Sequence, residues 1–381
     1  MRMISFGPVP IDPRAVRTAL DEALDALGTP AKLVVLYTPI DLHYPALLGP
    51  IVERTRAPLV GATTGGVAFT ERGATSEGLV GALLGGDLDV QVGLARGICA
   101  GLKEKVRAVM ADMQPKYPMV SSLVLADAFA CDGEALVAAL GENRPLYWRY
   151  FGGFAGDCQT YRGTRVLFGE AAYDDALVVA TISSPFQGRI RARHGFEIAP
   201  GARALRVTSA AGNAVRAIEG RPAADVYREE LDRLGVRLQD GQNLLSQMVC
   251  HSLGMSTPFG EGLNVRAPLK LGADGSMSLG GSIVADRVVH VVKATPDRVI
   301  EAAARLTADT LDGSGAKPRA HFVVDCGIRR LILGNRYAEQ IAAFEGPVPH
   351  PMLGFASYGE IARHGGTMQG FHNATAVSAV W

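Results

Sequence analysis

Short apolar runs recur along the chain, and each of them predicts a buried strand. Residues 32–37 form such a run, which is rich in β-branched side chains and is followed by Pro39. Residues 79–84 and 90–97 predict two further strands, which are separated by a Gly/Asp turn. The same pattern predicts strands in a later part of the chain, at residues 122–127, 176–182, 188–195, 320–325 and 371–381.

Helix-like stretches lie between several of these runs. Residues 41–55 predict a helix for which Asp41 is the expected N-cap. Residues 222–234 predict an amphipathic helix, because their apolar positions recur at i, i+3 and i+4. Two further helices are expected at residues 132–140 and 335–344, and a glycine-rich hairpin at residues 272–286.

A glycine-containing phrase occurs three times, at residues 58–67, 151–157 and 351–361. Each copy follows a strand and a helix and precedes another strand, and glycine there permits positive φ or a close backbone approach. The repetition predicts an internally duplicated strand–helix–glycine loop–strand unit. In this alignment Arg96-Gly97 falls on His194-Gly195. We therefore expect an α/β fold of two tightly packed halves, with mixed sheets and helices outside.

Composition adds limits on domains and partners. A chain of 381 residues exceeds one ordinary core, so two domains are expected, with a boundary near residues 200–220. The 38 basic and 38 acidic residues balance, which argues against nucleic acid or an anionic membrane as a partner. Neither a membrane-length apolar stretch nor a secretory leader is evident, so the expected location is the cytoplasm.

Cysteine chemistry is the first candidate for function. The five cysteines are widely spaced and form no CxxC pair, which indicates neither a zinc site nor a disulfide framework. Cys326 follows Asp325 and precedes Arg329, and a thiol near an arginine is a candidate nucleophile. The alternative is a small apolar packing residue. The sequence contains neither a G-x-S-x-G elbow nor an H-E-x-x-H motif.

The first two glycine loops and one histidine are candidates for ligand contact. Thr63 and Thr64 offer hydroxyl and N–H groups to an anion, although the first loop lacks the lysine of a P-loop. Asp157 is an acceptor or a cap. His194 lies at a strand end beside Gly195, where a ligand or metal can reach it, and the alternative is an ordinary hydrogen-bonded histidine.

Several phrases spread over the chain resemble FIST-domain proteins. These are the glycine loops, His194-Gly195-Phe196 with Pro200-Gly201, Gly212-Asn213-Ala214-Val215 with Ile218-Glu219-Gly220-Arg221-Pro222-Ala223, and Tyr358-Gly359-Glu360-Ile361 with Phe371-His372-Asn373-Ala374-Thr375. The resemblance implies a FIST N-type domain at residues 1–200 and a FIST C-type domain at residues 201–381. One departure is Thr64-Gly65-Gly66-Val67, where the family usually has Gly-Glu-Ile, so the acidic role falls to Glu360.

The resemblance implies a non-catalytic sensor of bacterial signal transduction that binds a small molecule and acts on a partner. One branch of stand-alone members binds haem and senses nitric oxide, and its partners are histidine kinases or cyclic-di-GMP enzymes. Three alternatives stay open: a metabolite sensor, a haem sensor with His194 on the iron, and an enzyme that uses Cys326. Homo-oligomerisation is also open.

A seam between the two halves is the expected binding site, because packed domains leave concave surfaces there. Arg329 is expected to pair in bidentate fashion with a ligand carboxylate. The side expected from the first half consists of Gly152, Gly153, Asp157 and His194, and the side from the second half of Cys326, Arg329, Tyr358, Glu360 and Asn373.

Overall fold

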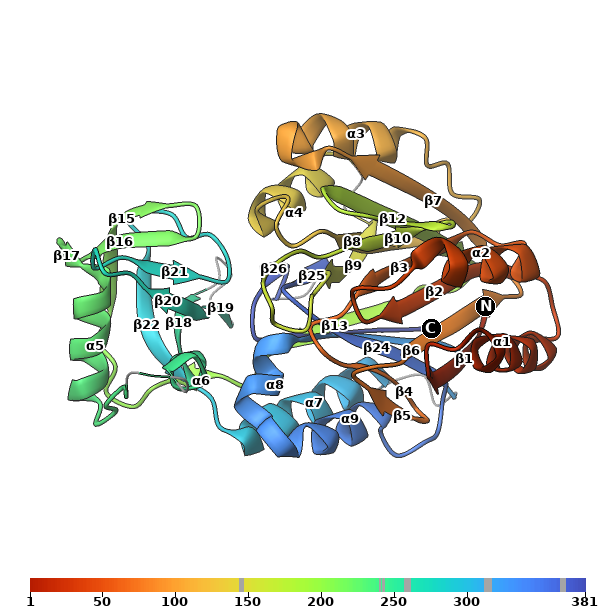
Figure 1. The fold of residues 1–381 in the computed structure, drawn as a ribbon. Coiled ribbons are helices and arrows are strands. Elements are labelled where there is room, and N and C mark those ends of the chain that lie inside the picture. Colours follow the sequence, from red (N-terminus) through yellow and green to blue (C-terminus); the bar gives the residue numbers. More distant parts are fainter. Residues whose placement is uncertain (144–146, 240, 242–243, 257–261, 312–316, 364–367) are drawn as a thin grey trace.

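The computed structural model describes residues 1–143, 147–239, 241, 244–256, 262–311, 317–363 and 368–381. Figure 1 shows a large body of sheets and helices and a smaller lobe beside it. The body is built from three copies of one unit. Each copy runs strand, helix, strand, helix, strand, hairpin, strand.

The first unit spans the N-terminal part of the chain. Its strand order is β1-β6-β2-β3, with β2 and β3 parallel and the other pairs antiparallel. Its elements are β1 (Arg2–Val9), α1 (Pro13–Leu27), β2 (Ala31–Thr38), α2 (Tyr44–Thr55), β3 (Leu59–Thr63), β4 (Ala68–Thr70), β5 (Gly73–Thr75) and β6 (Leu79–Gly85).

The second unit repeats this order as β7-β12-β8-β9, with β8 and β9 parallel. Its elements are β7 (Asp89–Arg96), η1 (Ile98–Ala100), α3 (Leu102–Ala111), β8 (Met119–Ala126), α4 (Gly133–Glu142), β9 (Arg149–Phe154), β10 (Val166–Phe168), β11 (Ala171–Tyr173) and β12 (Ala176–Ser184).

The third unit has the order β13-β27-β23-β24, with β23 and β24 parallel. The lobe is inserted after its first strand. Its elements are β13 (Arg189–Arg193), α7 (Pro296–Leu311), β23 (His321–Cys326), α8 (Gly327–Leu333), η2 (Gly334–Arg336), α9 (Tyr337–Glu345), β24 (Met352–Ser357), β25 (Glu360–Arg363), β26 (Gly370–His372) and β27 (Ala376–Val380).

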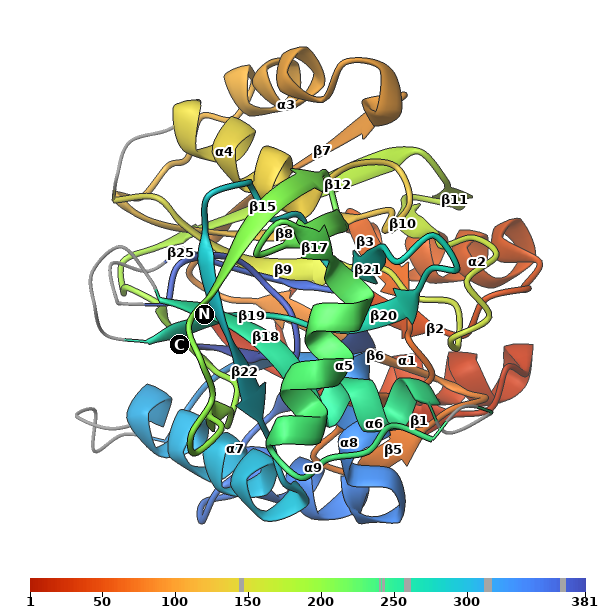
Figure 2. The same cartoon turned by 90° about the vertical axis from the view of Figure 1, so that its left-hand side faces the viewer.

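The three hairpins are exchanged in a cycle. The hairpin β4–β5 of the first unit pairs with β24 of the third, β10–β11 of the second pairs with β3 of the first, and β25–β26 of the third pairs with β9 of the second. Each unit therefore completes the six-stranded sheet of a neighbour. In Figure 2 the three helix groups occupy three separate positions around the body.

Strand alternation explains how the three sheets pack. Successive side chains of a strand point to opposite faces, so a strand buried on both faces is apolar throughout. In β2, Val35 packs in the central core shared by all three sheets, and Leu36 packs in the separate core under α1 and α2. In β8, Leu123 lies in the central core and Val124 under the helices. The sheets thus enclose one core and carry their helices outside.

Strand register confirms the predicted duplication. Gly61, Gly152 and Gly354 pair with equivalent residues of β2, β8 and β23, and all three lie two or three residues before the end of a strand. At Gly152, φ is 148° and an added Cβ would overlap the carbonyl of the neighbouring β8, so only glycine fits. The strand register also shows that His194 occupies the position in the third unit that Arg96 occupies in the second.

The lobe carries a nine-stranded sheet, and β14 (Glu197–Ile198) joins it through β22. Its other elements are β15 (Leu205–Ala211), β16 (Ala214–Ile218), β17 (Arg221–Pro222), α5 (Ala223–Arg233), α6 (Leu244–Cys250), β18 (His251–Ser256), β19 (Leu263–Arg266), β20 (Pro268–Leu271), β21 (Met277–Leu279) and β22 (Val288–Lys293). Figure 2 looks onto the lobe, with α5 in front of the body.

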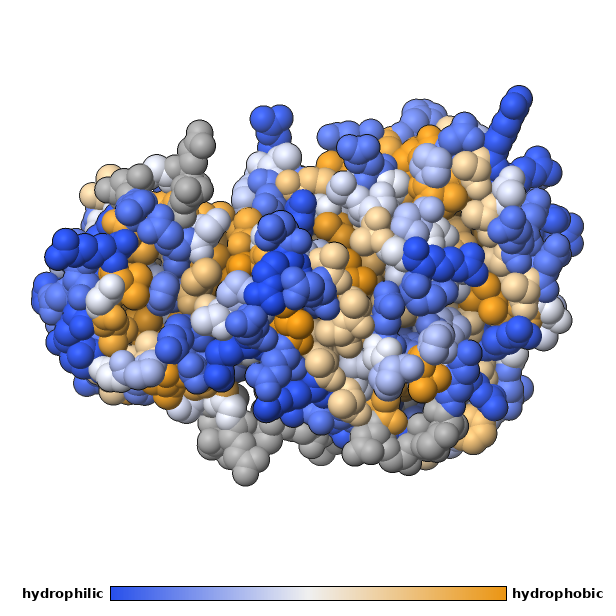
Figure 3. Space-filling model, turned by 90° about the horizontal axis from the view of Figure 1, so that it is seen from below, coloured by the Kyte–Doolittle hydropathy of each residue, from blue (hydrophilic) through white to orange (hydrophobic). Residues whose placement is uncertain are grey.

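Lobe and body share buried side chains. Val265 and Val292 of the lobe belong to the same apolar core as Val299 and Phe344 of the body. Viewed from below in Figure 3, the surface mixes hydrophilic residues with small apolar areas, and the lobe lies directly against the body. The segment 201–381 is thus divided between the lobe and the third unit of the body.

Two local predictions need correction. The second helix begins at Tyr44 rather than at residue 41, and Asp41 has φ 64° instead of the extended conformation of a cap. Pro45 in the first turn favours this later start, since its missing N–H costs nothing there. The predicted hairpin lies earlier than residues 272–286, because its strands are β20 and β21. Within the described residues, no helix is long and apolar enough to cross a membrane.

Candidate functional site

The ends of three strands meet at one place on the body, and backbone hydrogen bonds join them in a ring. Gly65 N–H donates to the carbonyl of Ala356 (2.6 Å), and Gly156 N–H donates to that of Thr63 (2.8 Å). Tyr358 N–H closes the ring on the carbonyl of Phe154 (3.0 Å). The three predicted glycine loops therefore converge, one from each unit.

Asp157 organises the loop that leaves this ring. Its carboxylate accepts from the hydroxyls of Tyr358 (2.5 Å) and Thr160 (2.7 Å). It also accepts three backbone N–H groups, those of Tyr161, Arg162 and Gly163. Burial raises the pKa of Asp157, but the hydrogen bonds from Tyr358 and its own loop outweigh burial and lower the pKa overall. An ionised Asp157 thus holds the loop in place.

The loop after Asp157 is held in an uncommon backbone conformation. Cys158, Gln159 and Tyr161 have φ values of 57°, 66° and 54°, a region that non-glycine residues rarely adopt. Gln159 N–H is fixed by the hydroxyl oxygen of Tyr358 (2.6 Å). Such residues cluster at binding sites, where surrounding bonds compensate for the strain.

An aromatic cluster, defined here as Phe129, Tyr161 and Tyr358, lies beside the ring. Tyr161 stacks on Tyr358 with ring centroids 5.4 Å apart, and Phe129 meets Tyr358 edge-on at 6.5 Å. Phe129 and Tyr161 are 53% and 48% exposed. Tyr358 and Phe129 line a cleft of about 360 Å³ between body and lobe, together with Ala128, Cys131, Asp132, Gly133, Phe154, Gly212, Asn213, Gly280, Gly281 and Phe371.

Glu360 and Cys326 lie behind the ring and are fully enclosed. The hydroxyl of Ser357 donates to Glu360 (2.6 Å), as does the Thr375 backbone N–H (3.3 Å). Burial raises the pKa of Glu360 well above its usual range despite these bonds. Burial likewise raises the pKa of the Cys326 thiol, and its side chain is 1% exposed. Cys326 lacks both the access and the lowered pKa that a nucleophile needs.

Arg329 is buried and lies away from the solvent-exposed side of the three glycine loops. Its guanidinium is completely buried, pairs with Asp325 (2.8 Å) and donates to Gln340 (2.9 Å). The remaining nitrogens donate to the backbone carbonyls of His194 (2.9 Å) and Val299 (3.0 Å). Because every nitrogen of this guanidinium already donates to a group of the protein, Arg329 is not part of the proposed ligand site.

Other predicted residues hold backbone in place. The hydroxyl of Thr63 donates to the carbonyl of Gly156 (2.6 Å), and that of Thr64 accepts from Gly66 N–H (3.3 Å). Gly153 pairs with Glu360 between β9 and β25. Asn373 donates to the carbonyl of Gly280 at the boundary with the lobe (3.1 Å).

His194 lies in a different cavity, beside α7. Its Nε2 is within 3.1 Å of the carbonyl of Leu263, and its Nδ1 accepts from Phe196 N–H at 2.8 Å. Burial, followed by the charge of Arg329, lowers the pKa of His194 to about 4. Both ring nitrogens are thus engaged by backbone. Haem iron would have to break one of these bonds, so the residues at this position do not fit haem ligation.

We expect titration of the purified protein with haemin to give no saturable Soret shift. The engaged nitrogens of His194 and the cavity beside it, lined by Arg191, Arg193, Arg298 and Arg305, oppose an apolar haem slot. Absorption spectra of the wild type and His194→Ala provide the test. A saturable shift in the wild type that the variant loses would restore the haem hypothesis.

Sequence reasoning missed Tyr161, Phe129 and Arg330. Arg330 lies next to Arg329, but an added Cβ on Gly66 would meet its Nη1 at 2.5 Å, which places it against the first glycine loop. Phe129 and Tyr161 lie in loops, where the sequence carries no periodic signal, and Arg330 lies in the short helix α8. Only the spacing from Asp157 to Tyr161 could have suggested a contact.

Two family models together match most of the chain. Residues 32–221 match the FIST N domain and residues 223–363 match the FIST C domain. A search of curated proteins finds no match. The chain belongs to the FIST family, whose domains are associated with sensing of small ligands in signal transduction.

Proposed function

We propose that this protein is a cytoplasmic sensor that binds a small molecule at the aromatic cluster and relays its presence to a partner by contact. The ligand would lie in the cleft between body and lobe. A site at a seam between two packed parts is the usual place for a small-molecule pocket.

The aromatic cluster is the observation that carries this proposal. Two of its three aromatic rings are about half exposed, beside the place where the three glycine loops converge. Aromatic faces left open to solvent beside a cleft supply a large apolar contact area for a ligand. Asp157 and the strained loop hold Tyr161 on Tyr358, so the surface is formed before a ligand arrives.

Arg330 supports a ligand with an anionic group. It adjoins Gly66, and its positive charge acts on Cys158 next to the cluster: burial raises the pKa of that thiol, and Arg330 offsets part of the increase. Among the residues that the structure describes, Arg330 has no carboxylate within ion-pair distance. A carboxylate on the ligand would give this guanidinium a charge-assisted partner.

Contacts across the cleft offer a route for the relay. The guanidinium of Arg266, on the lobe, is buried against Glu134 of the body and lies over the ring of Phe371 (5.5 Å). A ligand that contacts Phe129 beside α4 would bias how the lobe sits on the body. We propose a histidine kinase or a cyclic-di-GMP enzyme as the partner class that reads this change, as the family resemblance implies.

The test is native purification with mass spectrometry of bound metabolites, followed by thermal shift with a panel of amino acids and other carboxylic acids. We expect a panel member to stabilise the wild type. Tyr161→Ala and Arg330→Ala should each weaken its affinity about tenfold, the size of a lost aromatic contact or charged hydrogen bond. Phe186→Ala, an exposed phenylalanine outside the cleft, is the matched control. A ligand bound equally by all four proteins would contradict this site.

A further inference from the structure

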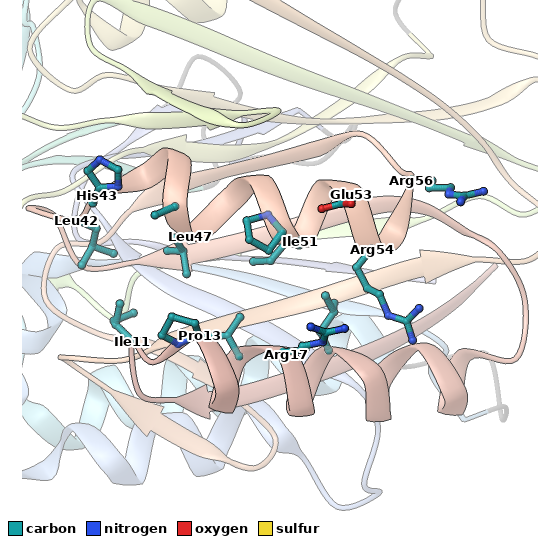
Figure 4. A pocket seen from close by; sticks show the side chains of 14 residues that line it. Ile11, Pro13, Arg17, Leu42, His43, Leu47, Ile51, Glu53, Arg54 and Arg56 are labelled. Carbon is teal, nitrogen blue, oxygen red and sulfur yellow. The ribbon is translucent and has the colours of Figure 1, made fainter.

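A third hollow lies on the first unit, between α1 and α2. It has a volume of about 830 Å³. In Figure 4, Ile11, Leu42 and Leu47 lie toward one end of this groove, and Arg17 and Arg54 face each other toward the other end. The remaining lining residues are Pro13, Val16, Leu20, His43, Ala46, Pro50, Ile51, Glu53 and Arg56.

The internal repeat provides a comparison within one molecule. In the second unit α3 packs on α4, and in the third unit α7 packs on α9, each pair more extensively than α1 packs on α2. The two helices of the first unit are therefore the least closely packed of the three pairs. A groove lies between them over the apolar core of the first unit, and Val16, Leu20 and Ile51 of that core form its floor.

The basic end of the groove carries more arginines than carboxylates. Arg54 pairs with Asp21 at 2.6 Å. Arg17 and Arg56 have no ion pair among the described residues, and Glu53 is the one acidic residue in the lining. An anionic group at this end would find at least one guanidinium without a competing carboxylate.

The apolar lining, the charge and the length of the groove decide between occupants. Val16, Leu20 and Ile51 are only 4%, 2% and 1% exposed, so they form the buried bottom of the groove, and Ile11 is 36% exposed. An apolar chain that ends in an anionic group matches both the apolar lining and the basic end of the groove. Along the groove, the 12 residues of α2 extend about 18 Å, which leaves room for a medium-length acyl chain.

We propose that this groove binds a single-chain amphiphile with an anionic head, such as a fatty-acid carboxylate. The chain lies along Ile11, Leu47 and Ile51, and the head meets Arg17 beside Arg54. This site is separate from the aromatic cluster and does not depend on the function proposed for it.

The probe is dodecanoate below its micelle concentration, measured by isothermal titration calorimetry on the full chain. We expect saturable binding whose affinity rises about fourfold for each CH₂ added between octanoate and dodecanoate, because each methylene leaves water. Dodecanol, which lacks the charge, should bind about tenfold more weakly.

Arg17→Glu should reduce dodecanoate affinity by at least about tenfold, and Leu47→Asp should abolish it. Arg14→Glu is the matched control, since Arg14 is an exposed arginine of α1 outside the groove and should leave affinity unchanged. Circular dichroism establishes that each variant is folded. Binding that is absent in the wild type, or equal in all variants, would overturn the proposal. Cosedimentation with phosphatidylglycerol vesicles without binding of free dodecanoate would also overturn it, because the surface would then recognise a bilayer.

Discussion

Arg329→Met should lower the free energy of unfolding by about 3–5 kcal/mol, the cost of leaving a buried charge without its partner. Asp325 and Arg329 form an ion pair at 2.8 Å, and neither side chain is exposed. Burial raises the pKa of Asp325 even against the opposing charge of Arg329, so the carboxylate depends on this arginine. Urea unfolding followed by circular dichroism measures the loss.

Two variants make this test specific. Arg305 and Glu301 form a pair with the same i, i+4 spacing, but both side chains are more than half exposed. Arg305→Ala should therefore change stability little, because exposed pairs are screened by water. The double variant Asp325→Asn/Arg329→Met should recover part of the loss, since it no longer buries an unpaired charge. If Arg329→Met resembled the exposed control, the buried pair would not support the fold.

Acidification from pH 7 to pH 4.5 should destabilise the wild type more than the His194→Gln variant, by about 2 kcal/mol. Burial lowers the pKa of His194 to about 4, whereas an unfolded histidine has a pKa near 6.5. Between these values the unfolded chain binds a proton that the folded chain excludes. The folded state therefore loses stability as pH falls through this window, and regains it as pH rises.

The measurement is urea unfolding of both proteins at pH 7 and pH 4.5. His194→Gln removes two hydrogen bonds and should be less stable than the wild type at pH 7. The difference in free energy of unfolding between the two proteins should be smaller at pH 4.5. His43→Gln, which replaces an exposed histidine, is the control for the loss of one histidine. An unchanged gap at the two pH values would contradict the buried position of His194.

His321 should also make the folded protein less stable as the pH falls, because its pKa is lowered too. Burial, followed by the charge of His350, lowers the pKa of His321 to about 3. Its two ring nitrogens lie 2.8 Å from His350 and 2.7 Å from Ser378. The sequence placed His321 in a buried strand, and the structure finds it there in β23.

The apolar runs and the glycine loops determined the repeated unit. A strand buried on both faces must be continuously apolar, and a backbone that approaches a neighbour as closely as Gly152 does must lack a Cβ. These are local requirements that a sequence records directly. They were enough to predict the three related loops, the repeated strand–helix–glycine loop–strand unit and the match of His194 with Arg96.

Tertiary structure alone decided which side chains meet. Arg329 and Arg330 are neighbours in sequence, but successive helical residues point in different directions, so one is sealed against Asp325 and the other faces Gly66. The exchange of hairpins between units, the insertion of the lobe after β13 and the open groove between α1 and α2 likewise follow from packing between distant segments. Periodicity reports which face of an element is buried, but it does not report what that face is buried against.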